Sequence, residues 1–146
     1  MKILLDTNVY IEACRSEERR NQFAKTFFPL LPFTFLSATV AYELSVNAAD
    51  QGTRGLIADF VGRLERVGRT VTPVFSDWLE ASELMTRIAQ NEKAWRSKLP
   101  QLQNDILIAL SARRIGATVL TYNRDDFLLI RRHKDFSLRV LILEQG

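Results

Sequence analysis

Four carboxylates stand where a fold could gather them into one site: Asp6, Glu43, Asp105 and Asp126. Asp6 comes directly after the apolar run Ile3–Leu5, which is typical of a buried strand in a parallel sheet. Ligands of open α/β sheets bind beyond the carboxyl ends of the strands, so Asp6 stands where chemistry is usually done. Taken alone, an Asp after a strand is more often a turn residue or a helix cap, and a catalytic interpretation depends on the other acids.

Glu43 lies in a predicted helix over residues 38–49, which Ser37 can cap. The apolar row of this helix is Val40, Leu44 and Ala48. Glu43 lies beside that row and is either a partly exposed boundary residue or a functional group. Helical side chains lean toward the helix N-terminus, so Glu43 could reach the carboxyl edge of the strand that precedes the helix.

Asp105 is predicted to begin a helix that has basic residues in its last turn and ends at Gly116. A strand over Thr118–Thr121 follows directly. A helix that packs on the strand it feeds runs antiparallel to it, and at 1.5 Å per residue this one is about 16 Å long. Its first residue is therefore expected over the end of the strand, at the same sheet edge as Asp6.

Three polar residues that follow Thr121 are candidates for the fourth position of the site: Asn123, Asp125 and Asp126. Asn123 is nearest the strand end and can donate or accept a hydrogen bond without supplying charge. Phe127 must enter the core, which holds its neighbour Asp126 near the sheet edge and leaves Asp125 freer to face solvent. We therefore place Asp126 first, and Asn123 and Asp125 stay open as candidates.

Carboxylates gather only around a cation, because like charges a few ångströms apart oppose each other's ionisation. The chain has one histidine and one cysteine. His133 lies in a polar, basic run, which is a poor place for a catalytic base, and Cys14 is predicted to be a small buried thiol. An all-oxygen ligand set selects Mg²⁺, with Mn²⁺ as a substitute. Such a site fits metal-dependent cleavage of phosphodiesters.

The net charge is +3, from 20 Lys and Arg against 17 Asp and Glu, and the isoelectric point is near 9.3. With four acids withdrawn into one site, the remaining surface is more positive still and suits a polyanion such as RNA. The arginines between positions 54 and 69 could line an RNA path, although a solvated helix face is the simpler explanation. Residues 91–99, polar and basic around Trp95, are expected to form a flap or a partner contact.

Strands alternate with helices along the chain, which is typical of a parallel sheet with right-handed crossovers. Further helices are predicted at 9–14, 17–28, 56–67 and 76–88, strands at 33–36, 71–74 and 139–143, and a short helix or loop at 127–130. The strand at 71–74 contains a proline and is expected at a sheet edge. The predicted fold is a three-layer α/β/α arrangement around a central, mostly parallel sheet of about five strands, in one domain over residues 1–146.

No apolar run approaches the ~20 residues of a membrane span, and no signal-type segment follows Met1, so we expect a cytoplasmic protein without a membrane partner. The segment Phe23–Phe28 and the strand led by Phe33 offer more apolar surface than a small sheet needs to cover itself. We therefore expect the helices between Val9 and Leu64 to contact partners, a second copy of the chain among them.

The motifs around the four acids resemble those of PIN-domain ribonucleases, and most of all the VapC-type toxins of bacterial toxin–antitoxin pairs. They are Ile3–Asn8, Ala41–Leu44, Asn104–Ala109 and Thr121–Phe127, which together span most of the chain. The resemblance implies a PIN-like fold and a metal-dependent endoribonuclease that often acts on tRNA or rRNA. It also implies a homodimer held inactive by a cognate antitoxin, a small protein whose tail enters the site.

One position departs from the family pattern. Many members have an acid where this chain has Asn123, and members with Asn there use the acid before the Phe, which is Asp126 here. The resemblance thus implies Asp6, Glu43, Asp105 and Asp126 as catalytic, metal-binding residues, with Asn123 orienting a water or a ligand.

Other activities fit the sequence less well. A haloacid-dehalogenase-like phosphatase needs a second Asp where this chain has Asn8, and a Rossmann-type nucleotide site needs a Gly-rich turn that the first strand lacks. The alternative that stays open is a PIN-like RNA-binding or interaction module with impaired catalysis, of which Asn123 is the first sign.

Overall fold

The computed structural model describes residues 1–48 and 50–143, and it confirms the predicted α/β class. The strands in these residues are β1 (Ile3–Leu5), β2 (Thr34–Ser37), β3 (Thr70–Val71), β4 (Thr118–Thr121) and β5 (Leu138–Val140). The α-helices are α1 (Thr7–Ala13), α2 (Glu17–Phe27), α3 (Ala38–Asn47), α4 (Gln51–Arg66), α5 (Phe75–Asn91), α6 (Leu99–Ile115) and α7 (Arg124–His133). Two short 3-10 helices are η1 (Phe28–Phe33) and η2 (Lys93–Lys98).

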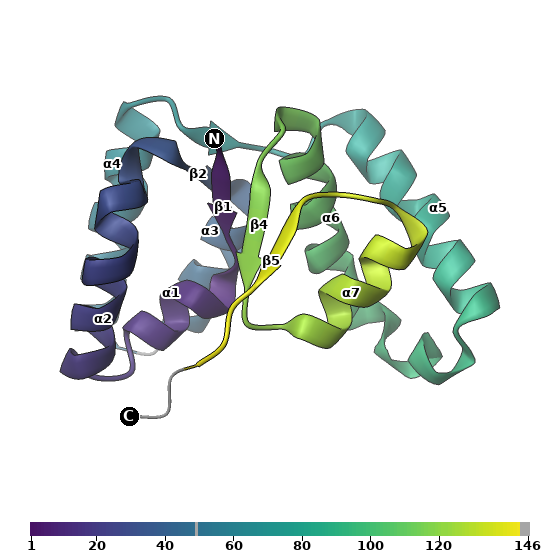
Figure 1. The fold of residues 1–146 in the computed structure, drawn as a ribbon, viewed down its shortest axis with the longest axis horizontal. Helices are drawn as coiled ribbons and strands as arrows, with labels where there is room; N and C mark the ends of the chain where they lie inside the picture. Colours follow the sequence, from purple (N-terminus) through teal and green to yellow (C-terminus); the bar gives the residue numbers. More distant parts are fainter. Residues whose placement is uncertain (49, 144–146) are drawn as a thin grey trace.

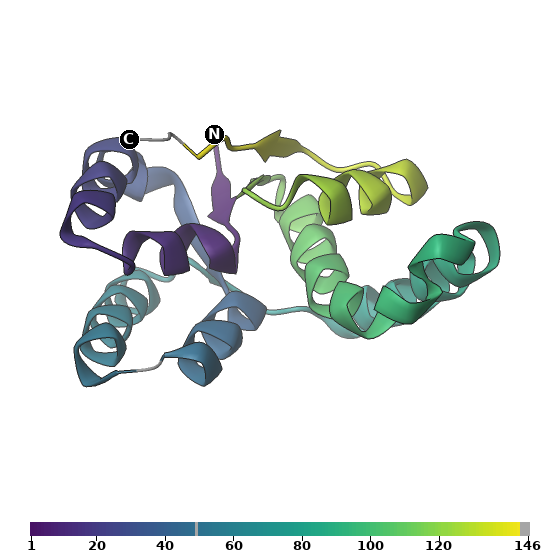
Figure 2. The ribbon, with the colours of Figure 1, turned by 90° about the horizontal axis from the view of Figure 1, so that it is seen from below.

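The sheet has the strand order β3-β2-β1-β4-β5, and every neighbouring pair is parallel. Ile3 of the middle strand lies opposite Thr34 on one side, and Leu5 lies opposite Leu120 on the other. α1, α2 and α4 lie on one side of the sheet and α5, α6 and α7 on the other (Figure 1). α3 follows directly from the carboxyl end of β2 and contacts both α1 and α6 (Figure 2). Because all strands run the same way, their carboxyl ends share one edge.

One buried cluster joins the sheet to both helical layers. β1 is buried along its whole length, as its apolar run predicts, and Val119 and Leu120 of β4 lie beside it. Ile106 and Leu110 of α6 and Phe127 of α7 belong to the same cluster. This packing fixes the ends of β1 and β4, which Asp6 and Asn123 follow. In the described residues, no helix combines the length and the apolar character needed to cross a membrane.

α6 and α4 begin five or more residues earlier than the sequence predicts. α6 begins at Leu99 rather than at Asp105, because Pro100 stands in its first turn, where no backbone N–H is needed and the fixed φ favours the helix. Asp105 is therefore in the second turn and not at the helix start. α4 begins at Gln51 rather than at residue 56, because Asp50 caps it by accepting a hydrogen bond from a backbone N–H three residues on (2.7 Å).

Several strand boundaries also differ from the prediction. β2 begins at Thr34, because Phe33 and both preceding prolines belong to η1. The two edge strands, β3 and β5, are shorter than the predicted 71–74 and 139–143, and β3 ends before Pro73, which has no backbone N–H to donate. The segment predicted as a helix or loop is the helix α7. Ala49, the predicted last residue of the helix at 38–49, lies outside the described residues, as do residues 144–146.

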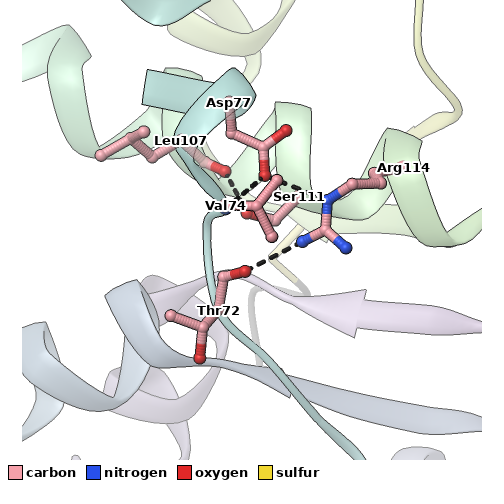
Figure 3. A network of polar contacts seen from close by, with 6 residues as sticks. All are labelled: Thr72, Val74, Asp77, Leu107, Ser111 and Arg114. Carbon is pink, nitrogen blue, oxygen red and sulfur yellow. Dashed lines mark hydrogen bonds and ion pairs between the residues drawn. The ribbon is translucent and has the colours of Figure 1, made fainter. Parts of the chain in front are cut away.

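A partly buried ion pair ties the start of α5 to the end of α6 (Figure 3). Oδ2 of Asp77 accepts hydrogen bonds from the backbone N of Val74 (2.9 Å) and from Nε of Arg114 (3.1 Å). Arg114 also donates through Nη2 to the backbone O of Thr72 (2.9 Å). Asp77 is only 5% exposed, whereas the Arg114 side chain is 35% exposed, so water screens this anchor on the arginine side only. It holds α6 at the end that leads into β4, and so contributes to the position of Asp105 near the other end.

Candidate active site

Asp6 follows β1 and precedes α1. Its backbone N donates to the carbonyl O of Leu120 (2.9 Å), so the contact with β4 extends to this residue. Its Oδ1 accepts a hydrogen bond from the backbone N of Thr7 (2.8 Å), which makes it the N-cap of α1. Its Oδ2 accepts from the hydroxyl of Thr121 at the end of β4 (2.7 Å). Asp6 is thus a helix cap and also a buried carboxylate held between two strand ends.

The hydroxyl of Thr121 connects several groups at the end of β4. It donates to Asp6 and accepts from the backbone N of Asn123 (2.9 Å) and from Nδ2 of Asn8 (3.3 Å). Oδ1 of Asn8 in turn accepts from the backbone N of Tyr122 (3.3 Å). Thr121 is fully buried, so these bonds lie away from bulk water, where they are electrostatically stronger. Together they fix the direction of the Asp6 carboxylate.

Glu43 reaches the start of α1 from the second turn of α3. Its Oε1 accepts a hydrogen bond from the hydroxyl of Thr7 (2.8 Å). The side chain is half-buried, as expected for a residue beside the apolar row of its helix. Because Thr7 is the neighbour of Asp6, this bond brings Glu43 to the carboxyl edge of β1.

Asp126 and Asn123 lie at the start of α7. Oδ2 of Asp126 accepts from Nδ2 of Asn123 (2.8 Å), and Asp126 also shares a hydrogen bond with Asp105 of α6. Asp125, in contrast, faces outward: its side chain is 80% exposed and pairs with Arg124 (3.7 Å). The structure therefore brings Asp126, and not Asp125, to the other acids, while its role as a ligand stays a prediction.

The four carboxylates act on one another electrostatically. Burial raises the pKa of Asp105 to about 9, with further increases from Asp6, Asp126 and Glu43 and from the hydrogen bond with Asp126. Burial also raises the pKa of Asp6 to about 6, although hydrogen bonds from two threonines lower it, and Glu43 and Asp126 add to the increase. Without a cation, Asp105 is therefore protonated at neutral pH.

No cationic side chain within residues 1–48 and 50–143 neutralises this cluster. None of the lysines and arginines there forms an ion pair with Asp6, Glu43, Asp105 or Asp126. A partly buried, mutually repelling set of carboxylates has the oxygen donors that Mg²⁺ prefers. The described side chains do not form a ready-made shell of three or more ligands, and each carboxylate accepts a hydrogen bond from a hydroxyl or amide or shares one with a carboxyl neighbour. Binding an ion requires the carboxylates to move closer to one another.

The histidine and the cysteine play no part in the cluster. His133 lies in the last turn of α7, with Nε2 3.3 Å from Oε1 of Glu92. Cys14 is the C-cap of α1, and burial raises the pKa of its thiol. The prediction of a buried thiol is wrong in degree, because Cys14 is half-buried at the point where α1 turns toward α2.

Sequence reasoning missed the two threonine hydroxyls as functional side chains. Thr7 holds Glu43, and Thr121 holds Asp6. The sequence signal that could have found them is a threonine close to an acid or an amide at the end of a strand. Thr7 directly follows Asp6 after β1, and Thr121 ends β4 two residues before Asn123.

A sequence model of the PIN domain family matches residues 3–132. Among solved structures, a chain in the complex of FitAB with the IR36 DNA fragment is similar over 99% of both chains, with a TM-score of 0.69 and 19% identity. VapBC2 from Rickettsia felis, bound to a DNA fragment from its promoter, is similar over 97% of this chain and 100% of that chain (TM-score 0.62, 20% identity). DNA-bound VapBC from Salmonella typhimurium is similar over 96% and 98% (TM-score 0.64, 20% identity). Identities this low show a shared fold, and no curated protein sequence matches the chain.

Proposed function

The chain belongs to the PIN-domain family, whose members are in general nucleases, and from that premise we propose that it is a metal-dependent endoribonuclease. The observation that carries the proposal is the set of mutually repelling carboxylates of Asp6, Glu43, Asp105 and Asp126, which no cationic side chain of the described residues neutralises. Such an arrangement is costly unless a bound cation offsets the repulsion. We propose RNA as the substrate, with tRNA and rRNA as the first to test.

In this proposal Asp6, Glu43, Asp105 and Asp126 hold a divalent ion, Mg²⁺ in the cell and Mn²⁺ as a substitute in vitro. When bound, such an ion polarises the phosphodiester and lowers the pKa of a water. The oxygen-only donor set fits a hard ion. Each carboxylate oxygen can accept more than one hydrogen bond or metal contact, so the bonds to protein donors leave lone pairs available.

The chain's own hydrogen bonds give the carboxylates their directions. Thr121 donates to Asp6, and Thr7 donates to Glu43. Asn123 donates to Asp126 and, being neutral, can orient a water without adding charge to the site. Burial of Asp6 keeps bulk water away, so a phosphate held here would interact with fixed protein dipoles in a medium of low dielectric.

We propose further that the protein is the toxin of a toxin–antitoxin pair, a cytoplasmic homodimer inhibited by a cognate antitoxin. The fold is shared over nearly the whole chain with VapBC and FitAB structures, which supports this assignment. Large apolar side chains are exposed between Val9 and Leu64 and provide surface for partners: Phe28, Tyr42, Val46 and Leu56.

Cleavage of a labelled RNA by the purified protein, with Mg²⁺, with Mn²⁺ and with EDTA, tests the enzymatic proposal. We expect Asp6→Asn and Asp105→Asn to abolish cleavage, and Asp126→Asn to slow it by about tenfold or more, as for loss of a ligand or of a group that orients one. Asn123→Ala should reduce the cleavage rate less than Asp126→Asn does, and Asp125→Asn should reduce it least of the three. Circular dichroism checks that each variant is folded. If Asp125→Asn is the most damaging of the last three, the fourth ligand must be reassigned to Asp125.

A second candidate is a PIN-like module that binds RNA or a protein but has impaired catalysis. The observation that favours it is Asn123, which stands where many family members have an acid. RNA that is bound but left intact with Mg²⁺ and with Mn²⁺ would support this candidate and contradict the enzyme.

A further inference from the structure

A cavity of about 570 Å³ lies between η2 and α7, beside the acid cluster but separate from it. Its apolar wall comes from Trp95, Leu128 and Leu129. Two arginines, Arg131 and Arg132, and two aspartates complete the lining. The mechanism proposed above makes no use of this cavity.

The first turn of α7 connects the cavity to the acid cluster. Asp125 lines the cavity, and the next residue, Asp126, hydrogen-bonds with Asp105 in the cluster. The Cα atoms of the consecutive residues Asp125 and Asp126 are about 3.8 Å apart, as in any trans peptide. A nucleic acid strand with one phosphate at the acids therefore has the cavity within reach of a neighbouring nucleotide.

The net positive charge of the protein is concentrated on the two segments that bound the cavity. Residues 92–98 and 124–135 together contain seven Lys and Arg and four Asp and Glu, a surplus of three that equals the net charge of +3 of all 146 residues. Of the acids, Asp125 is paired with Arg124, and Asp126 belongs to the cluster that would bind a cation. This distribution favours a polyanion at the cavity mouth.

Trp95 gives the cavity a feature that phosphate binding alone does not require. Its ring is half-buried and packs against the core, and Nζ of Lys98 lies 5.1 Å from the ring centroid. An aromatic ring held in place near arginines is the kind of surface on which proteins stack the unpaired bases of single-stranded RNA. Leu128 and Leu129 extend this apolar surface along α7.

We propose that the cavity holds one unpaired nucleotide of a single-stranded RNA, next to the phosphate that is cut. The base lies against Trp95 and Leu128, and its phosphate lies near Arg131 and Arg132. This inference rests on the proposed function and identifies the place beside the acids where the substrate is gripped.

Intrinsic fluorescence gives a direct test. The chain has two tryptophans, so Trp78→Phe, a conservative change of a half-exposed residue on α5, leaves Trp95 as the only reporter. We expect a short oligouridine RNA, added in EDTA so that no cleavage occurs, to quench Trp95 in a saturable way. An abasic ribose-phosphate strand of the same length should bind about tenfold more weakly or worse, as expected from the loss of base stacking.

A matched pair of double variants distinguishes RNA binding at the cavity from binding to positive charge elsewhere on the surface. Arg131→Ala with Arg132→Ala removes two exposed arginines of α7, one of them paired with Glu92. Arg63→Ala with Arg66→Ala removes two exposed arginines of α4, one of them paired with Asp59. We expect the α7 variant to lose about tenfold more affinity for oligouridine than the α4 variant.

Equal losses of affinity in the two double variants would overturn the proposal that the cavity holds a nucleotide, and so would equal binding of the oligouridine and abasic strands. Either result would leave the proposed function intact. A wild-type protein that neither binds nor cleaves any RNA would contradict the proposed function and this inference with it. Quenching of Trp95 by an oligoglutamate peptide but not by RNA would also overturn the inference, and would assign the cavity to an acidic protein segment.

Discussion

Asp105 couples the acid cluster to the stability of the metal-free protein. Its pKa is about 9 in the folded chain, against a reference value of 3.8. Between these values the folded state retains a proton that the unfolded chain has released, so the free energy of unfolding falls as the pH rises through this window. The contribution is complete below about pH 4 and is lost above about pH 9. Asp6, with a pKa of about 6, adds to the same trend in the lower part of the window.

We expect Asp105→Asn to show a smaller fall in the free energy of unfolding between about pH 5 and about pH 8, because Asn carries no proton to lose. Urea unfolding in EDTA at the two pH values measures this difference. Asp125→Asn removes an exposed carboxylate and is the control, which should keep the wild-type pH dependence. If Asp105→Asn also keeps the wild-type pH dependence of the free energy of unfolding, the pKa of Asp105 is not raised in the folded protein.

Thr121 is expected to set the direction of the Asp6 carboxylate. Thr121→Val keeps the side-chain shape and removes the hydroxyl, so Asp6 and the backbone N of Asn123 each lose a partner. We expect the affinity for Mn²⁺ to fall by about tenfold to a hundredfold, and the melting temperature to fall because buried polar groups lose a partner. Calorimetric titration and thermal melts measure the two effects.

Thr121→Ser keeps the hydroxyl and should restore Mn²⁺ binding. Equal Mn²⁺ affinity in Thr121→Val and Thr121→Ser would mean that the hydroxyl stabilises the fold without orienting Asp6.

The sequence could indicate which acids to consider, but not what holds them. Asp6 and Asp126 were found because each stands close to the end of an apolar strand, which is a local signal. The bond between Thr121 and Asp6 joins residues 115 positions apart, and no local pattern reports it. That these acids bind a metal stays a prediction, since proximity alone does not make them ligands.

At the scale of the elements, the parallel sheet was predictable and the helix starts were not. Alternating strands and helices favour a parallel sheet with right-handed crossovers, whereas the strand order β3-β2-β1-β4-β5 does not follow from the alternation alone. The helix predicted from Asp105 leaves out Pro100, although proline is well suited to a first helical turn. The edge strand β3 has two residues, too few for a periodic signal.

The anchor between α5 and α6 is expected to stabilise the packing of these two helices. Asp77→Ala leaves Arg114 and the backbone N of Val74 without their shared acceptor, and we expect a loss of about 1 to 3 kcal/mol in the free energy of unfolding. Asp59→Ala breaks an exposed ion pair with Arg63 and should cost less than about 0.5 kcal/mol. Urea unfolding of both variants tests this difference, and equal costs would mean that the anchor is no stronger than a surface pair.

At the scale of the whole molecule, neighbouring exposed apolar side chains lie on α3 and on the start of α5. Tyr42 and Val46 are four residues apart on α3 and therefore share one side of that helix. Phe75, Trp78 and Leu79 have the corresponding spacing at the start of α5, where Phe75 is 79% exposed. The sequence predicts partner contacts at the helices between residues 9 and 64, and the exposed residues of α5 lie outside that range.

The aromatic residues that motivated this expectation divide between the surface and the interior: Phe28 and Phe33 are exposed, whereas Phe23 and Phe27 pack inside. Phe23 packs on Phe27 with ring centroids 5.0 Å apart, and Tyr10 packs on Phe60 at 5.2 Å. These rings bind α1, α2 and α4 to one another. Composition reveals that a segment is rich in phenylalanine, but which helix covers it depends on contacts between distant residues. The interface prediction therefore rests on the exposed apolar residues of this stretch, of which Tyr42 and Val46, on one side of α3, are the first to test.

We expect the wild-type chain to have twice the monomer mass of 16.8 kDa by light scattering, and Tyr42→Glu with Val46→Glu to return it to the monomer. Two carboxylates in a buried apolar contact would lose their hydration without a partner, which strongly disfavours association. Glu43 lies between these two positions in the sequence, so a second copy bound here would approach the acid cluster. Phe75→Glu with Leu79→Glu makes an equal change of charge on α5 and should leave the mass doubled. If the α5 variant alone becomes a monomer, the interface lies on α5 and its predicted place between residues 9 and 64 is wrong; a monomeric wild type would contradict the dimer itself.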